Sequence, residues 1–121
     1  MHVVRFTEAP AYTAPGHHDM QMVRVQGREA GPSSEVWAGV SVIAPGGGTT
    51  LSGSSLEKIY VVLEGTLHVS NGEHEVAIGR WDSCRIAAGE ERRLTNRTTS
   101  PVTVLLVMPL SADERAAAQV G

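Results

Sequence analysis

Apolar and polar residues alternate with a period of two over much of the chain. In residues 35–43, valine or alanine occupies every second position from Val36 to Val42. The positions of the other parity include the apolar residues Trp37 and Ile43. A period of two is typical of a β-strand. Apolar residues at both parities predict a strand that is covered on both of its faces.

Further strands follow from the same pattern and from the turn residues that separate them. The expected strands are residues 2–6, 20–26, 57–63, 66–70, 73–78, 81–86, 92–97 and 102–108, of which 57–63 is the strongest because it is rich in Ile, Tyr and Val. Pro45 and the three glycines after it should end the strand at residue 43, because proline cannot donate to a ladder and glycine permits turn dihedrals. Short strands at regular spacing predict a β-sandwich or a small barrel.

Two local motifs add detail to this prediction. Asn71-Gly72 is typical of a two-residue type I′ hairpin turn, which would place His68 opposite Glu75 and leave His68 and His74 as a surface pair. A helix is expected only in the tail from residue 111, where a serine and a glutamate stand at capping-box spacing before an alanine run.

Length and composition exclude several classes of protein. With 121 residues the chain is long enough for a single core and too short for two domains. The net charge is −3, and the basic residues are scattered, so nucleic acid is not an expected partner. The apolar runs are too short to span a membrane, and one cysteine, Cys84, excludes an internal disulfide framework. These features predict a cytoplasmic protein without membrane contact.

Two segments resemble the sequence motifs of the cupin family. The first motif, G-x5-H-x-H-x3-E-x6-G, matches the spacing of residues 46–65, and the second, G-x5-P-x-G-x2-H-x3-N, falls on residues 81–96. The matched positions are Gly46, Ser52, Ser54, Lys58 and Gly65 in the first motif, and Trp81, Ala87, Gly89, Arg92 and Asn96 in the second. The resemblance implies an all-β cupin barrel, that is, a jelly roll or double-stranded β-helix, in a single domain. We expect N-terminal strands and loops in residues 1–34, the barrel in 35–110, a short tail in 111–121, and a homodimer.

The metal ligands of the cupin motifs are replaced in this sequence. Cupins hold a divalent metal with two histidines and a glutamate of the first motif and one histidine of the second. The matching residues are Ser52, Ser54, Lys58 and Arg92. An ammonium and a guanidinium would repel a divalent ion, so we expect neither a metal nor another cofactor.

The replaced positions form a candidate anion site. Strand alternation places Lys58 and Tyr60 on one face, and the motif spacing adds Ser52, Ser54 and Arg92. Arg92 can bind a carboxylate bidentately and Lys58 supplies a point charge, while the two serines orient the ligand. A desolvated lysine beside another cation has a lowered pKa, which makes Lys58 a candidate general base or Schiff-base nucleophile, with Tyr60 as its catalytic neighbour.

Other interpretations of these residues stay open at the level of sequence. Lys58 and Arg92 could instead reach solvent, or pair with Glu57, Glu90 or Glu91 in a decayed site. Cys84 is either a buried small apolar residue or a reactive thiol, and Arg85 either a third cation of the pocket or a surface charge. The loop histidines His17 and His18 either face solvent, close the pocket or bind a metal.

Three functions fit these features, and the sequence does not choose among them. The first is a metal-independent enzyme that moves a proton in a small anionic, carboxylate-bearing metabolite, as an isomerase or a lyase does. The second is a sensor or carrier that binds such a metabolite without chemistry. The third is a structural cupin with a vestigial site. Whether the protein is an enzyme is therefore open.

Overall fold

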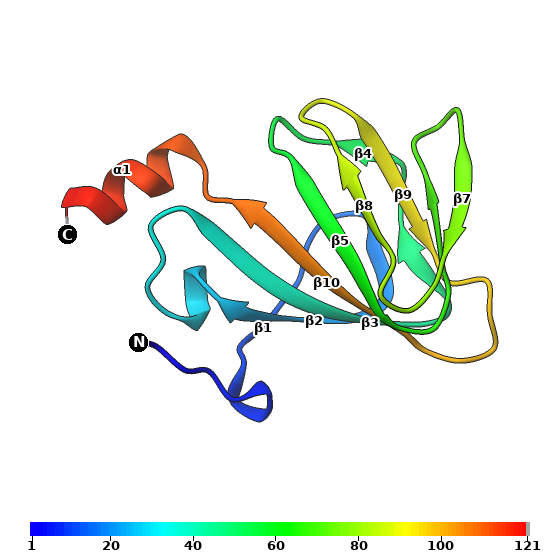
Figure 1. The fold of residues 1–121 in the computed structure, drawn as a ribbon, viewed down its shortest axis with the longest axis horizontal. Coiled ribbons are helices and arrows are strands. Elements are labelled where there is room, and N and C mark those ends of the chain that lie inside the picture. The colour runs from blue at the N-terminus through cyan, green and yellow to red at the C-terminus, as the bar shows by residue number, and fades with distance from the viewer. Residues whose placement is uncertain (121) are drawn as a thin grey trace.

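The structure of the protein is a computed structural model that describes residues 1–120 (Figure 1). Its elements, in chain order, are η1 (Phe6–Glu8), β1 (Ala11–Tyr12), β2 (His17–Gln26), η2 (Arg28–Ala30), β3 (Val36–Thr49), β4 (Ser52–Gly53), β5 (Lys58–Glu64), β6 (Leu67–Ser70), β7 (Glu75–Ile78), β8 (Ser83–Ile86), β9 (Glu91–Thr95), β10 (Val102–Pro109) and α1 (Ala112–Val120), where η marks a 3-10 helix. The prediction of an all-β protein with one helix in the tail is confirmed.

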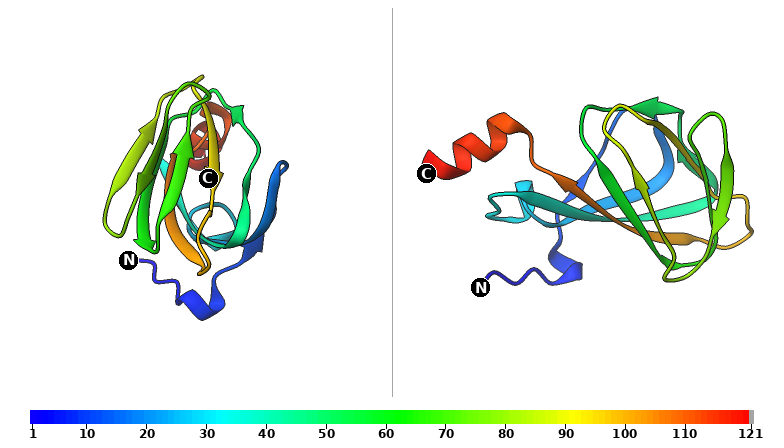
Figure 2. Two further views of the ribbon diagram at one scale, coloured as in Figure 1. Left: turned by 90° about the vertical axis from the view of Figure 1, so that its right-hand side faces the viewer. Right: turned by 45° about the horizontal axis from the view of Figure 1, so that its top comes forward.

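The strands form one antiparallel barrel. Neighbouring strands follow the order β7-β6-β9-β3-β10-β5-β8, with β2 paired to β3, β1 to β2 and β4 to β9. Figure 2 shows the strands of residues 52–95 arched over β3 and β10, with the N-terminal strands beside them. The predicted division at residues 34 and 110 stays a prediction, and residue 121 of the expected tail lies outside the described residues.

Alternation along the strands fills the barrel with apolar side chains. Ile43, Val62, Leu67, Val102 and Val104 come from four strands, and each is almost completely buried. Burying an aliphatic side chain of this size contributes about 1.5–3 kcal/mol, so these residues supply much of the driving force for closing the barrel. A second, smaller cluster packs around Trp37, Met108 and Leu110 where β3 and β10 extend beyond the other strands.

The glycines of residues 46–48 do not end β3, contrary to the prediction. The strand runs on to Thr49, and the Gly46 amide donates to the Asn96 carbonyl at 2.9 Å, while the Asn96 amide donates to the Gly47 carbonyl at 3.0 Å. A Cβ on Gly48 would overlap the Leu94 carbonyl. The glycines therefore serve the close approach of β9 rather than a turn.

The predicted two-residue hairpin is also wrong. Ser70 pairs with Glu75, so residues 71–74 form a longer loop, and His68 lies opposite Ala77. The Asn71 side-chain oxygen accepts the backbone amides of residues 73 and 74 at 3.0 and 2.8 Å. These two bonds stabilise an Asx-type loop in place of a type I′ turn.

The N-terminal segment departs from the prediction as well. Residues 2–6 do not form a strand, because the Glu8 and Ala9 amides donate to the carbonyls of Arg5 and Phe6 and close the 3-10 turn η1. The expected strand at 20–26 starts earlier, at His17, since its first residues pair with the glycine-rich end of β3.

The helix α1 begins with the predicted capping box. The Glu114 amide donates to Ser111 Oγ at 3.1 Å, and the Ser111 amide donates to Glu114 Oε1 at 3.0 Å. Arg28 of η2 donates two hydrogen bonds to the same glutamate at 3.0 and 3.1 Å, which attaches the helix to the N-terminal segment. Within residues 1–120, no helix has the length and apolarity needed to cross a membrane.

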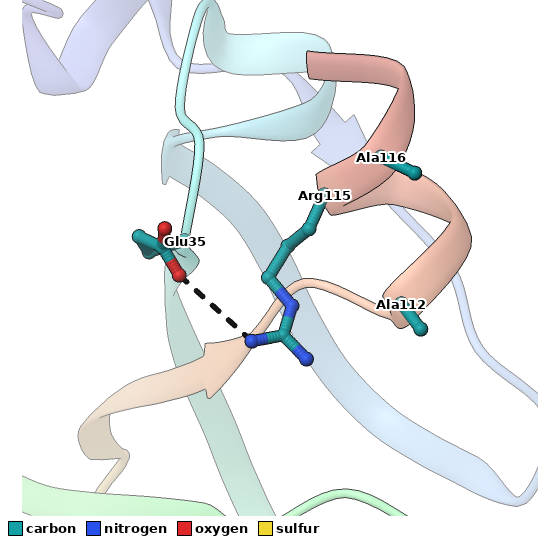
Figure 3. A pocket seen from close by; sticks show the side chains of 4 residues that line it. All are labelled: Glu35, Ala112, Arg115 and Ala116. Atoms are coloured by element: carbon teal, nitrogen blue, oxygen red, sulfur yellow. Dashed lines mark ion pairs between the residues drawn. The ribbon is translucent and has the colours of Figure 1, made fainter. Parts of the chain in front are cut away.

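A shallow notch lies where α1 passes the start of β3. It has a volume of about 250 Å³, and Arg115 reaches across it to Glu35 at 3.8 Å (Figure 3). Both side chains of this ion pair are largely exposed, so it contributes little to stability. The notch is lined by alanines and this single ion pair and offers no buried polar group to a ligand.

Candidate functional site

The five predicted site residues come together at one end of the barrel, where Lys58, Tyr60 and Arg92 are buried and Ser52 is exposed. Lys58 and Tyr60 lie on the inward face of β5, and Ser52 pairs with Arg92 where β4 meets β9. Lys58 is 6% exposed, Tyr60 3% and Arg92 5%, so both cations are buried. Neither side chain as a whole extends into solvent.

Among the described residues, Arg92 donates its hydrogen bonds to neutral oxygens. Its Nε donates to the Tyr60 hydroxyl at 2.9 Å, and its Nη1 donates to Ser52 Oγ at 3.0 Å and to the Thr50 carbonyl at 3.4 Å. These bonds orient the guanidinium without neutralising its charge. The carbonyl of Thr50 is a contact that the sequence motif did not indicate.

Lys58 is held in a similar way. Its Nζ donates to Ser54 Oγ at 2.8 Å. Ser54 itself is fixed by the backbone of Leu56, whose carbonyl and amide lie 3.1 and 3.2 Å from the serine oxygen. Burial lowers the pKa of Lys58, and the positive charge of Arg92 lowers it further, because both effects disfavour the ammonium.

The carboxylates that could have paired with these cations lie elsewhere. Glu57 accepts a hydrogen bond from Arg85 at 2.6 Å on the outside of the barrel. Glu90 accepts the Ala87 amide at 3.0 Å and the Asn71 side-chain amide at 3.2 Å. Glu91 is exposed, and among the ion pairs of residues 1–120 none includes Lys58 or Arg92.

Tyr60 keeps its proton beside the guanidinium. Burial raises the pKa of Tyr60, and the charge of Arg92 opposes that rise. Because the hydroxyl oxygen already accepts the Arg92 Nε–H, its own hydrogen is free to donate to a ligand. The hydroxyl can therefore stabilise an oxygen atom that gains negative charge.

Of the two adjacent histidines, His17 lies nearer to the candidate site, close enough for the charge of Arg92 to act on it. Burial lowers the pKa of His17. The hydrogen bond that its Nδ1–H donates to the Pro15 carbonyl at 2.8 Å opposes this shift, and the charge of Arg92 adds to it. His18 is exposed and lies 3.4 Å from the Asp19 carboxylate. Both residues belong to β2 and not to a loop.

Cys84 and Arg85 take opposite faces of β8. Cys84 pairs with Tyr60 and packs against the core, and burial raises the pKa of its thiol, so it behaves as a partly buried apolar residue. Arg85 points outward to Glu57 and is a surface charge.

The donor set does not fit the metal that cupins ordinarily hold. The four ligand positions carry two hydroxyls and two cations, and Lys58 and Arg92 have no lone pair to offer while they are charged. Within the described chain, no group of three His, Cys, Asp or Glu side chains could share a metal ion.

The structure adds a second polar group to the barrel that the sequence analysis did not single out. The Arg24 guanidinium carbon lies 3.4 Å from the centre of the Tyr12 ring and 4.1 Å from that of Trp37. Alternation with Met22 along β2 could have indicated Arg24 as an inward residue. The two-residue strand that places Tyr12 carries no such periodic signal.

Sequence comparison identifies the class of protein that this barrel defines. The Cupin domain family matches residues 39–108, and the chain belongs to the cupin family. Among curated proteins, the β-D-galactosidase Rv1717 of Mycobacterium tuberculosis is 40% identical over 108 residues, which are 89% of this chain and 93% of that protein.

Solved structures show the same fold at lower sequence identity. The polyketide cyclase RemF of Streptomyces resistomycificus has a TM-score of 0.79 at 20% identity, covering 98% of this chain and 93% of its own. A predicted oxalate decarboxylase of Thermotoga maritima has a TM-score of 0.76 at 22% identity, covering 90% and 99%. A sugar phosphate isomerase of Silicibacter pomeroyi has 0.76 at 20%, covering 89% and 75%. At these identities the likeness establishes the fold alone.

Proposed function

We propose that this cupin binds a small carboxylate-bearing metabolite between Lys58 and Arg92 without a metal. The observation that carries the proposal is the pair of buried cations whose hydrogen-bond partners are all neutral oxygens. Burying a charge without a counter-charge is costly, and two like charges in one barrel add to that cost. A bound carboxylate reduces both the cost of burial and the repulsion between the two cations, since Arg92 can bind it with two parallel hydrogen bonds.

The same geometry supports proton transfer. A neutral Lys58 amine would take the proton from the carbon next to the carboxyl group, and the electron pair would move onto an oxygen held by Arg92 and the Tyr60 hydroxyl. The Lys58 ammonium then returns the proton to a neighbouring carbon, which is an isomerisation. Alternatively, a group on that neighbouring carbon leaves with its electron pair and takes up the proton, which is a lyase reaction.

Schiff-base chemistry is the variant of this mechanism that can be tested most directly. Lys58 is the only lysine of the chain, so its amine and the N-terminal amine are the two that can condense with a carbonyl substrate. Borohydride reduction in the presence of small keto acids should attach the acid to the peptide that contains Lys58. If the keto acid is attached only at the N-terminal amine, the Schiff-base variant is excluded. Proton transfer by Lys58 without a covalent intermediate would then be the mechanism to test.

A non-catalytic carrier or sensor requires the same binding residues. It differs from the enzyme in what Lys58→Met does: a carrier loses affinity, whereas an enzyme loses turnover and keeps part of its affinity. A structural cupin with a vestigial site predicts that no carboxylate raises the melting temperature and that Lys58→Met stabilises the protein with no loss of function.

Hydrolysis of a β-galactoside is a second candidate, favoured by the function in the name of the 40% identical relative. Glycosidases ordinarily use two carboxyl groups that flank the scissile bond. The buried polar residues of the described chain are Arg24, Ser41, Thr49, Lys58, Arg92 and Asn96, none of which is acidic. Release of nitrophenol from nitrophenyl β-D-galactoside by the wild type, lost in Arg92→Met and retained in Arg93→Met, would support this candidate.

Calorimetry against a panel of small carboxylates tests the main proposal. Arg92→Met should weaken binding by about 1.5–3 kcal/mol, the range for a hydrogen bond to a charged group. Arg93→Met is the matched control, because Arg93 is the next residue of β9 and is exposed. If wild type and both variants bind no carboxylate, the anion site does not exist.

Two expectations about the protein as a whole are part of this proposal. We infer that the chain forms a homodimer through the outer face of its sheet. The cytoplasmic location stays a prediction from the composition.

A further inference from the structure

Three buried N–H groups on β2 and β3 lie close together and have no partner in hydrogen-bond geometry among the described residues. They are Nε and Nη1 of Arg24 and Nε1 of Trp37. The Arg24 side chain is 9% exposed and Trp37 is 4% exposed, so solvent does not readily supply the missing partners. Unsatisfied buried donors are rare in native proteins, and each one requires an explanation.

The environment of Arg24 shows what kind of group is missing. The Glu29 carboxylate lies 3.3 Å from Arg24 Nε, so the charge of the guanidinium already has a counter-ion. The rings of Tyr12 and Trp37 pack against the guanidinium, within 3.4 and 4.1 Å of its carbon. What is missing is therefore a set of hydrogen-bond acceptors rather than a second negative charge. Hydroxyl or carbonyl oxygens of a ligand fit this need.

The pairing of the strands places these donors on the same concave face as the anion site. Tyr60 pairs with Leu106, Leu106 with Gly39, and Gly39 with Arg24, which forms one row across β5, β10, β3 and β2. Trp37 lies two residues before Gly39 on β3, in the next row of the same face, and pairs with Met108 of β10. Lys58 belongs to β5, which lies two strands from β3. At about 4.8 Å between strands, this separation is about 10 Å along the sheet.

Gly39 lies between the two groups in this row, and its missing side chain leaves room for two aromatic residues. A Cβ at this position would lie 3.0 Å from the Trp37 ring and 3.3 Å from the Tyr12 hydroxyl. The missing side chain therefore lets the two aromatic residues fold over the middle of the sheet, toward the row that holds Tyr60. A ligand of about six or seven non-hydrogen atoms in length would span the distance of about 10 Å between the two groups.

From these observations we propose that Arg24 and Trp37 form a second subsite, which accepts the hydroxyl or carbonyl oxygens of a polyhydroxylated carboxylic acid. This inference rests on the proposed function, because the carboxylate of the same ligand would lie between Lys58 and Arg92. The ligand class is then a sugar acid rather than a short-chain acid. The hydroxyl or carbonyl oxygens of such a ligand would accept hydrogen bonds from Arg24 and Trp37. Its carboxylate would interact with the charges of Lys58 and Arg92.

The experiment compares acids of different length by calorimetry. D-Galacturonate and D-gluconate represent the ring and open-chain forms of a sugar acid, glycolate represents the carboxylate end alone, and D-galactose lacks the charge. In the wild type at least one sugar acid should bind ten-fold or more tighter than glycolate, and galactose should bind more weakly than galacturonate.

Two variants assign the difference to the subsite. Trp37→Phe retains the ring and removes only the N–H, and it should weaken the sugar acid about five-fold and leave glycolate unchanged. Arg24→Lys retains the charge beside Glu29 and removes the planar group of donors, with the same selective loss. The melting temperature of each variant shows whether the barrel is intact.

Failure of the inference can be distinguished from failure of the proposed function. If no acid binds to the wild type, the anion site itself is absent and the inference fails with it. If glycolate binds as tightly as both sugar acids, or if Trp37→Phe weakens all acids equally, the subsite is overturned and the anion site remains. Ordered water would then satisfy the three donors.

Discussion

Lys58 differs from an ordinary surface lysine in both its solvation and its neighbours. It is buried, its ammonium has a single hydroxyl partner, and the pKa is lowered by burial and by Arg92. A group with a lowered pKa in the folded state releases its proton before the unfolded state does. Between the lowered value and the ordinary 10.5, the unfolded chain therefore binds more protons, and stability rises with pH.

This rise of stability with pH leads to a prediction for the protein without ligand. The free energy of unfolding of the wild type, minus that of Lys58→Met, should increase between pH 7 and pH 10. The buried thiol and tyrosines, whose pKa values are raised, contribute equally to both proteins and cancel in the difference. Urea unfolding at several pH values measures it. A difference that is flat or that falls with pH would mean that the Lys58 ammonium is not destabilised in the folded barrel.

At the scale of the elements, the end of β3 depends on glycine for two different reasons. Gly46 has a φ of +81° and open space around its Cα, whereas Gly48 has a φ of +152° and lies against the Leu94 carbonyl of β9. Gly46→Ala should cost about 1–2 kcal/mol for the left-handed backbone alone. Gly48→Ala should cost clearly more, because the β9 backbone must move as well. Thermal unfolding of both variants tests this, and equal costs would contradict the close approach of β9.

The end of β3 also shows which features of the fold and the site could be predicted from the sequence. The cupin spacing correctly brought Ser52, Ser54, Lys58 and Arg92 to one place, because the motifs specify which strand positions face inward. The continuation of β3 through Gly46 could not be predicted in this way, since its partner, β9, follows more than forty residues later. Arg24 could have been predicted as an inward residue from its alternation with Met22, but its stacking partner Tyr12 could not, because Tyr12 lies on a two-residue strand with no periodic pattern.

At the scale of the whole molecule, the outer face of the barrel carries a row of aliphatic side chains. Val23, Val40, Leu105 and Val61 pair in succession across four strands and point away from the core, and each is partly exposed. An open groove of about 490 Å³ runs beside this row, next to Val42. A row of aliphatic side chains on a sheet face is the kind of surface that a second copy covers.

The homodimer is therefore the last prediction. Light scattering at micromolar concentration should give twice the 12.8 kDa of one chain. Val40→Glu should shift the mass toward a single chain, because a carboxylate in the middle of the row would have to be desolvated in the interface. Val76→Glu is the matched control, since Val76 is an exposed valine on the edge strand β7, away from the row. A wild type that runs at 12.8 kDa, or a Val40→Glu variant that remains dimeric and folded, would show that this face is not the interface.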